Sequence, residues 1–167
     1  VWDYYYYTGD QEFLRAVWPW VLKNLDGADT FKDERGLFSV SAWNMFDWVK
    51  VDDEQRTVLH NSMFLVGAIN AAIQCAEVLG EEDSIAPYRA RRDELVSAIN
   101  TLWDESKGAF PDAVRDDGSI SPSICQHTSF LAVLYEIVEG ARREKALQNS
   151  LEPPEGMLKV GSPFAMM

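Results

Sequence analysis

The sequence contains few of the residues that build metal and redox sites. It has only two cysteines and two histidines in 167 residues. Cys75 and Cys125 both lie in apolar helical patterns, which is typical of small buried thiols without a chemical role. His60 and His127 stand far apart, without further ligands at the spacing of a zinc site. We therefore expect no bound metal and no cofactor.

Positive charge is also scarce. Lysine and arginine together number 15, against 27 aspartates and glutamates, which gives a formal net charge of −12. Proteins that bind nucleic acids neutralise phosphates with basic patches. The acidic balance therefore excludes a nucleic-acid partner and favours a neutral or cationic small substrate.

Several longer signals are missing as well. No uninterrupted apolar run reaches the ~18–20 residues of a membrane span, and no charged segment with a cleavage site opens the chain. There is no glycine-rich phosphate loop and no Gly-x-Ser-x-Gly turn. We expect no membrane partner, slightly favour a cytoplasmic location, and disfavour nucleotide-binding and serine-hydrolase functions.

What remains is a helical pattern in a chain of ordinary globular composition, 47% hydrophobic and 25% charged. Asp10 caps one predicted helix and Pro19 opens the next, while Gly9, Gly80 and Gly140 each follow a helix end. Residues 37–53 lose the helical period and predict an irregular loop with a short strand. The predicted helices cover residues 2–8, 11–17, 19–31, 57–79, 87–108, 124–138 and 141–151, and Ser162 followed by Pro163 predicts the start of a further one.

The helices alternate in character along the chain. Residues 57–79 are apolar on nearly every side, whereas 87–108 carry a single apolar stripe, and the same contrast recurs between 124–138 and 141–151. A helix that is apolar all round is buried all round. The alternation favours two concentric helical layers over a linear stack of repeats. We predict an all-α fold in which residues 1–167 are a single partial domain, and the remainder of the same chain completes the barrel.

The long loops before the apolar helices should gather at one end of such a barrel. They cover residues 37–54, 110–121 and 152–161, and the first two combine aromatic residues with carboxylates. Aromatic rings stack on the apolar faces of sugars while carboxylates bind hydroxyls. The loops therefore favour a carbohydrate as the partner.

Five stretches, in this order along the chain, carry a family resemblance: Tyr7–Leu14, Phe46–Trp48, Leu102–Phe110, Gln126–Thr128 and Gly161–Phe164. Together they resemble the helical catalytic domain of α-L-rhamnosidase-type glycoside hydrolases. The resemblance implies a central part of an (α/α)6 six-hairpin barrel.

The resemblance also implies a reaction, the inverting hydrolysis of terminal α-L-rhamnosides. Inverting glycosidases use a carboxylic acid that protonates the leaving oxygen and a carboxylate that activates water, about 6.5–9.5 Å apart. In the family the acid lies in an acidic, arginine-containing motif upstream of the Thr-Gly-Asp junction, and the base is a glutamate well downstream. Neither motif is present here. We therefore expect no catalytic residue in this segment.

The loop pair Asp47 and Trp48 matches the family's Asp-Trp pair. The resemblance implies a carboxylate that binds sugar hydroxyls and an indole that lines the pocket. The alternative is a buried Trp48 that plugs the loop, with Asp47 capping a turn. Trp43 and Asn44 are expected to line the same pocket, with a core position as the alternative.

The two histidines are further substrate-binding candidates because each begins an apolar helix at the end that should face the funnel. A structural role is the main alternative for His60, while His127 could bind sugar or orient a carboxylate. Asp112 is a weaker pocket candidate. We interpret Asp52–Glu54 as a charge cluster favoured by the positive end of the next helix.

Two other functions stay open. The segment could be a non-catalytic helical-repeat interaction module, or a lectin-like descendant of a glycosidase that binds sugar without cleaving it.

Overall fold

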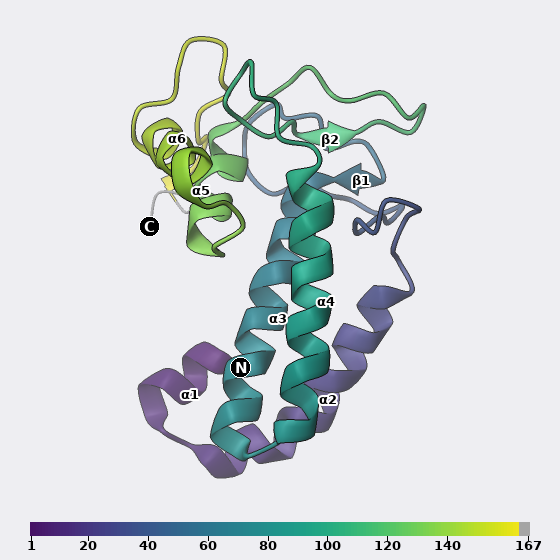
Figure 1. The fold of residues 1–167 in the computed structure, drawn as a ribbon, viewed down its shortest axis with the longest axis vertical. Coiled ribbons are helices and arrows are strands. Elements are labelled where there is room, and N and C mark those ends of the chain that lie inside the picture. The colour runs from purple at the N-terminus through teal and green to yellow at the C-terminus, as the bar shows by residue number, and fades with distance from the viewer. Residues whose placement is uncertain (164–167) are drawn as a thin grey trace.

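Six helices and two very short strands form residues 1–163, the part of the chain that this computed structural model describes (Figure 1). The strands β1 (Thr57–Val58) and β2 (Ala113–Val114) pair antiparallel, with Thr57 opposite Val114. The helices are α1 (Trp2–Thr8), α2 (Gln11–Asp29), α3 (Leu59–Leu79), α4 (Glu82–Asn100), α5 (Gln126–Leu134) and α6 (Gly140–Leu151).

Several helix ends follow the local signals. The Asp10 carboxylate accepts the backbone N–H of Phe13 at 2.9 Å and caps α2. Gly9 and Gly80 adopt the left-handed conformation, with φ of 69° and 72°, directly after α1 and α3. The helix predicted after Ser162 and Pro163 would fall on residues outside the described part.

Other boundaries differ from the prediction. Helix α2 runs through Pro19, because the proline removes only one backbone hydrogen bond while Leu14, Trp18 and Leu25 anchor the helix in the core on both sides. Helix α4 likewise begins at Glu82, before Pro87.

Helix α4 also ends at Asn100 instead of reaching Gly108. Beyond it the Asp104 carboxylate accepts the backbone N–H groups of Ser106 and Lys107, a local pattern that competes with helix. Helix α5 is shorter than predicted at both ends. Backbone bridges hold Ile124 and Cys125 extended before it, and Glu136 has a φ of 55° beyond it.

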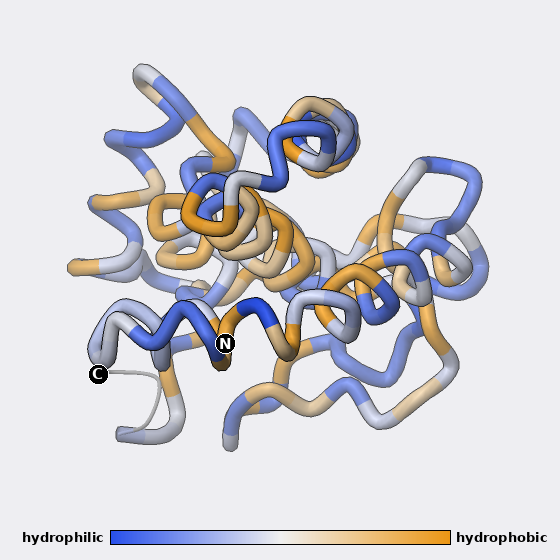
Figure 2. The backbone as a smooth tube through the Cα atoms, turned by 90° about the horizontal axis from the view of Figure 1, so that it is seen from below, coloured by the Kyte–Doolittle hydropathy of each residue, from blue (hydrophilic) through white to orange (hydrophobic). Residues whose placement is uncertain are grey.

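Helix α3 is the centre of the fold. It contacts α1, α2, α4 and α5, and apolar residues along its whole length are buried, as predicted. Figure 2, viewed from below, shows apolar stretches toward the middle of the molecule. By length and composition alone α3 could cross a membrane, and its burial among the other helices accounts for this apolarity. Its largest fully buried side chains are Leu59, Met63, Ile69 and Val66.

The helices form two layers. In Figure 1, α1 and α5 lie on one side of α3, while α2 lies on the other with α4 packed along α3. In the pairs α3–α4 and α5–α6 the second helix is the less buried one: α6 buries only Ala146 and Asn149, and α4 only Tyr88, Leu95 and Ile99. This arc of helical hairpins confirms the all-α fold predicted as part of an (α/α)6 barrel.

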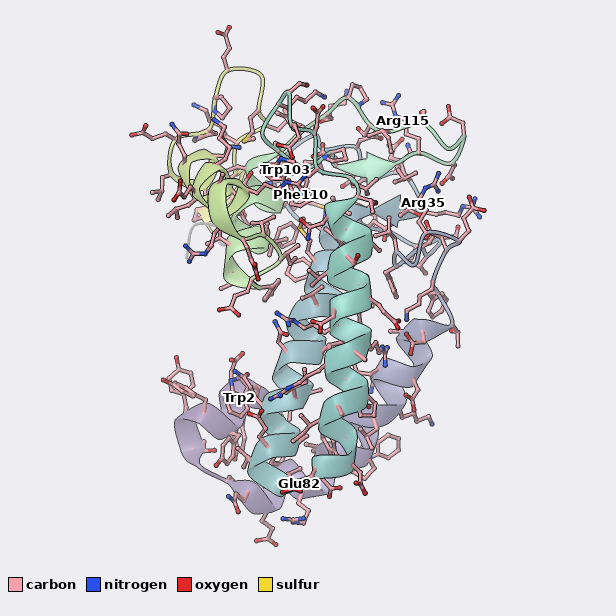
Figure 3. All side chains as sticks on the ribbon, viewed as in Figure 1. Trp2, Arg35, Glu82, Trp103, Phe110 and Arg115 are labelled. Atoms are coloured by element: carbon pink, nitrogen blue, oxygen red, sulfur yellow. The ribbon has the colours of Figure 1, made fainter. Side chains whose placement is uncertain are left out.

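The three long connections meet at one end of the arc, at the top of Figure 1, and Figure 3 shows Trp103, Phe110 and Arg115 at this end and Glu82 at the other. They precede α3, α5 and the end of the described chain. Both cysteines are free and buried within the helical core, as expected. Burial raises the pKa of the Cys125 thiol far above its usual range, so this thiol stays protonated and unreactive.

Candidate functional site

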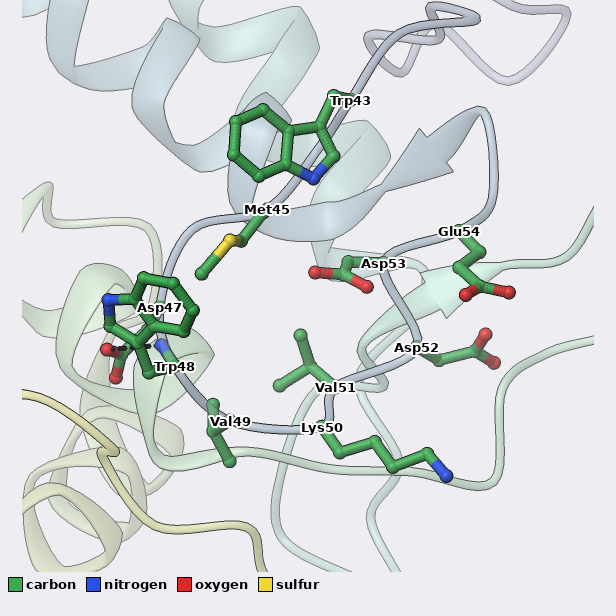
Figure 4. Close-up of a pocket in the computed structure, with 10 residues that line it drawn as sticks. All are labelled: Trp43, Met45, Asp47, Trp48, Val49, Lys50, Val51, Asp52, Asp53 and Glu54. Carbon is green, nitrogen blue, oxygen red and sulfur yellow. Dashed lines mark hydrogen bonds between the residues drawn. The ribbon is translucent and has the colours of Figure 1, made fainter.

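An open pocket of about 680 Å³ lies in the loop that precedes α3. Its walls are Trp43, Met45 and the run from Asp47 to Glu54, drawn in Figure 4. The loop curves around the pocket, with the Trp48 ring at one side and Asp53 at the other. Trp43 and Trp48 are 86% and 81% exposed. The alternatives in which Trp48 plugs the loop and Trp43 belongs to the core are therefore wrong.

Asp47 lies beneath this wall, with its side chain 1% exposed. One carboxylate oxygen accepts the N–H of Trp48 at 2.7 Å, and the other accepts the N–H of Gly161 at 2.8 Å and Nε2 of His127 at 2.7 Å. Burial raises the pKa of Asp47, but the hydrogen bonds from Ser162, Gly161, His127 and Trp48 together outweigh it and hold this pKa well below its usual range. Asp47 is therefore an ionised, buried anchor.

His127 and His60 both pack against the ring of Phe46, which belongs to the loop. The ring centroids are 5.2 Å and 5.3 Å from that of Phe46. His60 donates from Nε2 to the backbone carbonyl of Asn44 at 3.0 Å. Burial lowers the pKa of His60 to about 4, against the opposing effect of this hydrogen bond, so its ring is neutral near pH 7.

Asn44 ties the loop to α3. It donates to the carbonyl of Gln55 at 2.9 Å, and its side-chain oxygen accepts from Asn61 at 2.9 Å. Asn44, His60 and His127 are all buried. The structure thus brings the predicted residues together: Trp43, Trp48 and Asp47 line the pocket, His127 bonds to Asp47, and His60 bonds to Asn44 of the same loop.

Asp53 is a pocket residue that the sequence interpretation assigned elsewhere. Helix α3 begins at Leu59, so Asp52–Glu54 do not form its first turn, and that interpretation is wrong. Burial raises the pKa of Asp53, and the nearby carboxylates of Glu54, Asp112 and Asp52 raise it further. A backbone hydrogen bond lowers this pKa but does not cancel the rise. The sequence signal that could have identified Asp53 as a pocket residue is the run of three carboxylates, Asp52–Glu54, directly after the aromatic-rich part of the loop.

The loop is also joined to the next one along the chain. Arg115 donates to the Asp52 carboxylate at 2.8 Å, and Asp112 accepts the N–H of Asp52 at 3.3 Å. Asp112 is 2% exposed and supports the pocket through this hydrogen bond to the backbone of Asp52. Among residues 1–163, no three of the histidines, cysteines and carboxylates come together as a possible metal site.

The comparisons with known proteins agree on one family. Residues 1–160 match the model of the bacterial alpha-L-rhamnosidase 6 hairpin glycosidase domain. A GH78 family rhamnosidase of Bacillus sp. GL1 superposes with a TM-score of 0.94 at 30% identity, over 99% of this chain and 18% of that one.

A rhamnosidase from Klebsiella oxytoca, with rhamnose bound, superposes with a TM-score of 0.79 at 22% identity, over 99% of this chain and 31% of that one. No curated protein sequence matches this chain. The chain thus spans less than a third of either solved rhamnosidase. It belongs to the bacterial α-L-rhamnosidase six-hairpin glycosidase domain family.

Proposed function

We propose that the full-length protein hydrolyses terminal α-L-rhamnosides with inversion, and that this segment supplies one wall of the sugar pocket. The observation that carries the proposal is the open pocket between two exposed tryptophans, at the loop end of a rhamnosidase-family barrel segment. Aromatic side chains that border a concave site are typical of small-molecule binding pockets.

In this proposal Trp48 and Trp43 stack on the apolar faces of the substrate, and Asp53 borders the same space. Asp47, Asn44, His60 and His127 hold the wall in place from beneath. The acid and base of the inverting reaction belong to other segments of the full chain.

Turnover by the full-length protein is the first test. It should release the aryl group from an aryl α-L-rhamnoside, and the first rhamnose formed should have the β configuration in proton NMR spectra. Retention of the α configuration would refute inversion. Binding of rhamnose without turnover would instead indicate a lectin-like protein, and turnover by residues 1–167 alone would place the acid and base within them.

The tryptophans test the pocket itself. Trp48→Ala should raise KM about tenfold, the value of one good aromatic contact, with a smaller change in kcat. Trp20→Ala is the matched control, because Trp20 is 62% exposed on α2 and lies outside the pocket wall. Equal KM values for the two variants would remove Trp48 from the binding site.

A further inference from the structure

Three segments that are distant in the sequence meet at Asp47. Its carboxylate joins the pocket loop to His127, 80 residues along the chain at the start of α5, and to Gly161, 114 residues along. A buried carboxylate is stable only when donors surround it. Here the donors are Trp48 N–H, Gly161 N–H and the His127 ring. With these three bonds and a side chain that is 1% exposed, Asp47 serves as a buried junction between the segments.

The same junction fixes the backbone of Trp48. Its N–H is bonded to Asp47, and its carbonyl group packs directly against Gly161. A Cβ at position 161 would overlap the Trp48 carbonyl oxygen and would lie 2.7 Å from the carbonyl carbon. Trp48 is 81% exposed, so few surrounding side chains hold its ring, and the backbone sets the direction of the Cα–Cβ bond from which the ring projects.

His127 contributes its hydrogen bond to this junction alone. Its ring is 1% exposed, Nε2 bonds to Asp47, and Nδ1 has no hydrogen-bond partner within residues 1–163. The imidazole also packs against the rings of Phe46 and Phe130. Among the described residues, its one hydrogen bond to the pocket loop is therefore the one to Asp47.

We propose that His127 is a positioning residue that, together with Gly161, holds Asp47 and thereby sets the direction of Trp48 in the pocket. The inference rests on the proposed function for its kinetic consequences. It differs from a direct role of Asp47 or His127 in sugar binding, because both side chains are only 1% exposed.

Kinetics of the full-length protein on an aryl α-L-rhamnoside give the first readout. His127→Leu removes the donor, whereas His127→Gln places an N–H at a similar distance from the backbone. We expect KM to rise about five- to tenfold in the leucine variant, the loss of one aromatic contact, with kcat changed less than about threefold. The glutamine variant should return KM to within about threefold of the wild type.

Thr128→Val is the matched control. Thr128 is fully buried beside His127, and its hydroxyl bonds to the Cys125 carbonyl and not to Asp47. This variant should lower stability and leave KM unchanged. An equal rise of KM in Thr128→Val and His127→Leu would mean that any loosening of α5 has the same effect, and would overturn the proposal.

A second readout needs no substrate. In protein labelled with 5-fluorotryptophan, the ¹⁹F signal of Trp48 is identified by its loss in Trp48→Phe. His127→Leu should shift this signal, and His127→Gln should restore it. If the wild type neither cleaves nor binds rhamnosides, the proposed function fails, while the ¹⁹F signal still decides the positioning role.

An unchanged Trp48 signal in His127→Leu would overturn the inference. If that variant does not fold, Gly161→Ala replaces it, because Gly161 is exposed and a Cβ there would overlap the Trp48 carbonyl oxygen. It should shift the same signal, and no shift would likewise overturn the proposal.

Discussion

Asp47→Asn should destabilise the protein far more than the loss of one charge implies. The amide offers one oxygen and one NH2 group where the carboxylate offered two oxygens. If the oxygen faces His127 and Gly161, the NH2 group opposes the N–H of Trp48. If the oxygen faces Trp48, the NH2 group opposes the backbone N–H of Gly161, which can only donate a hydrogen bond.

In either orientation at least one buried donor loses its partner. An unsatisfied buried group costs about 1–3 kcal/mol, and bonds to charged acceptors lie at the upper end. We expect a loss of about 2–4 kcal/mol, measured as a fall of several degrees in the calorimetric midpoint of the full-length protein.

The control is Asp117→Asn. Asp117 lies on the surface, where its carboxylate accepts from the N–H and hydroxyl of Ser119. The same change of charge there should leave the midpoint nearly unchanged. Equal midpoints for Asp47→Asn and Asp117→Asn would refute the reasoning.

The pH dependence gives a second check on Asp47. Because its folded-state pKa lies below the unfolded value of about 3.9, its stabilising contribution is complete above that value and is lost as the pH falls further. The difference between wild type and Asp47→Asn should thus be constant above about pH 5 and should shrink below about pH 4. A difference that grows on acidification would contradict an ionised, bonded Asp47.

Two further predictions concern the scaffold. A Cβ on Gly67 of α3 would meet the Tyr135 ring at 2.5–2.9 Å, whereas one on Gly27 of α2 would meet nothing within 4 Å. Gly67→Ala should therefore lower the free energy of unfolding by about 1–3 kcal/mol, measured by thermal unfolding. Gly27→Ala should be neutral or stabilising. A similar cost for both would contradict this packing. His60 should titrate by NMR with a pKa of about 4. Since the unfolded chain takes up this proton at a higher pH, its burial should destabilise the fold as the pH falls below about 6.5, and a pKa near 6.5 would place His60 in water.

The layering of the fold could be predicted because it depends on local composition. Helix α3 is apolar on all sides and α4 on one stripe, so their burial follows from periodicity alone. Gly9 and Gly80 end their helices for the same local reason. Two helix limits were mispredicted. Pro19 predicted a break in α2, but packing in the core keeps the helix continuous. The apolar pattern predicted that α4 continues past Asn100, but beyond it the Asp104 carboxylate binds nearby backbone N–H groups and competes with helix.

The sequence by itself determined the helical hairpins, their alternation and the motifs that identify the family, because each depends on residues a few positions apart. Only the tertiary structure decided the roles of the candidate residues. Asp47, His127 and Gly161 meet across 80 and 114 residues, and their contact exists only because the loops converge at one end of the arc. At this contact the side chain of Asp47 is buried and acts as an anchor. Trp48, its neighbour in the chain, is exposed in the pocket.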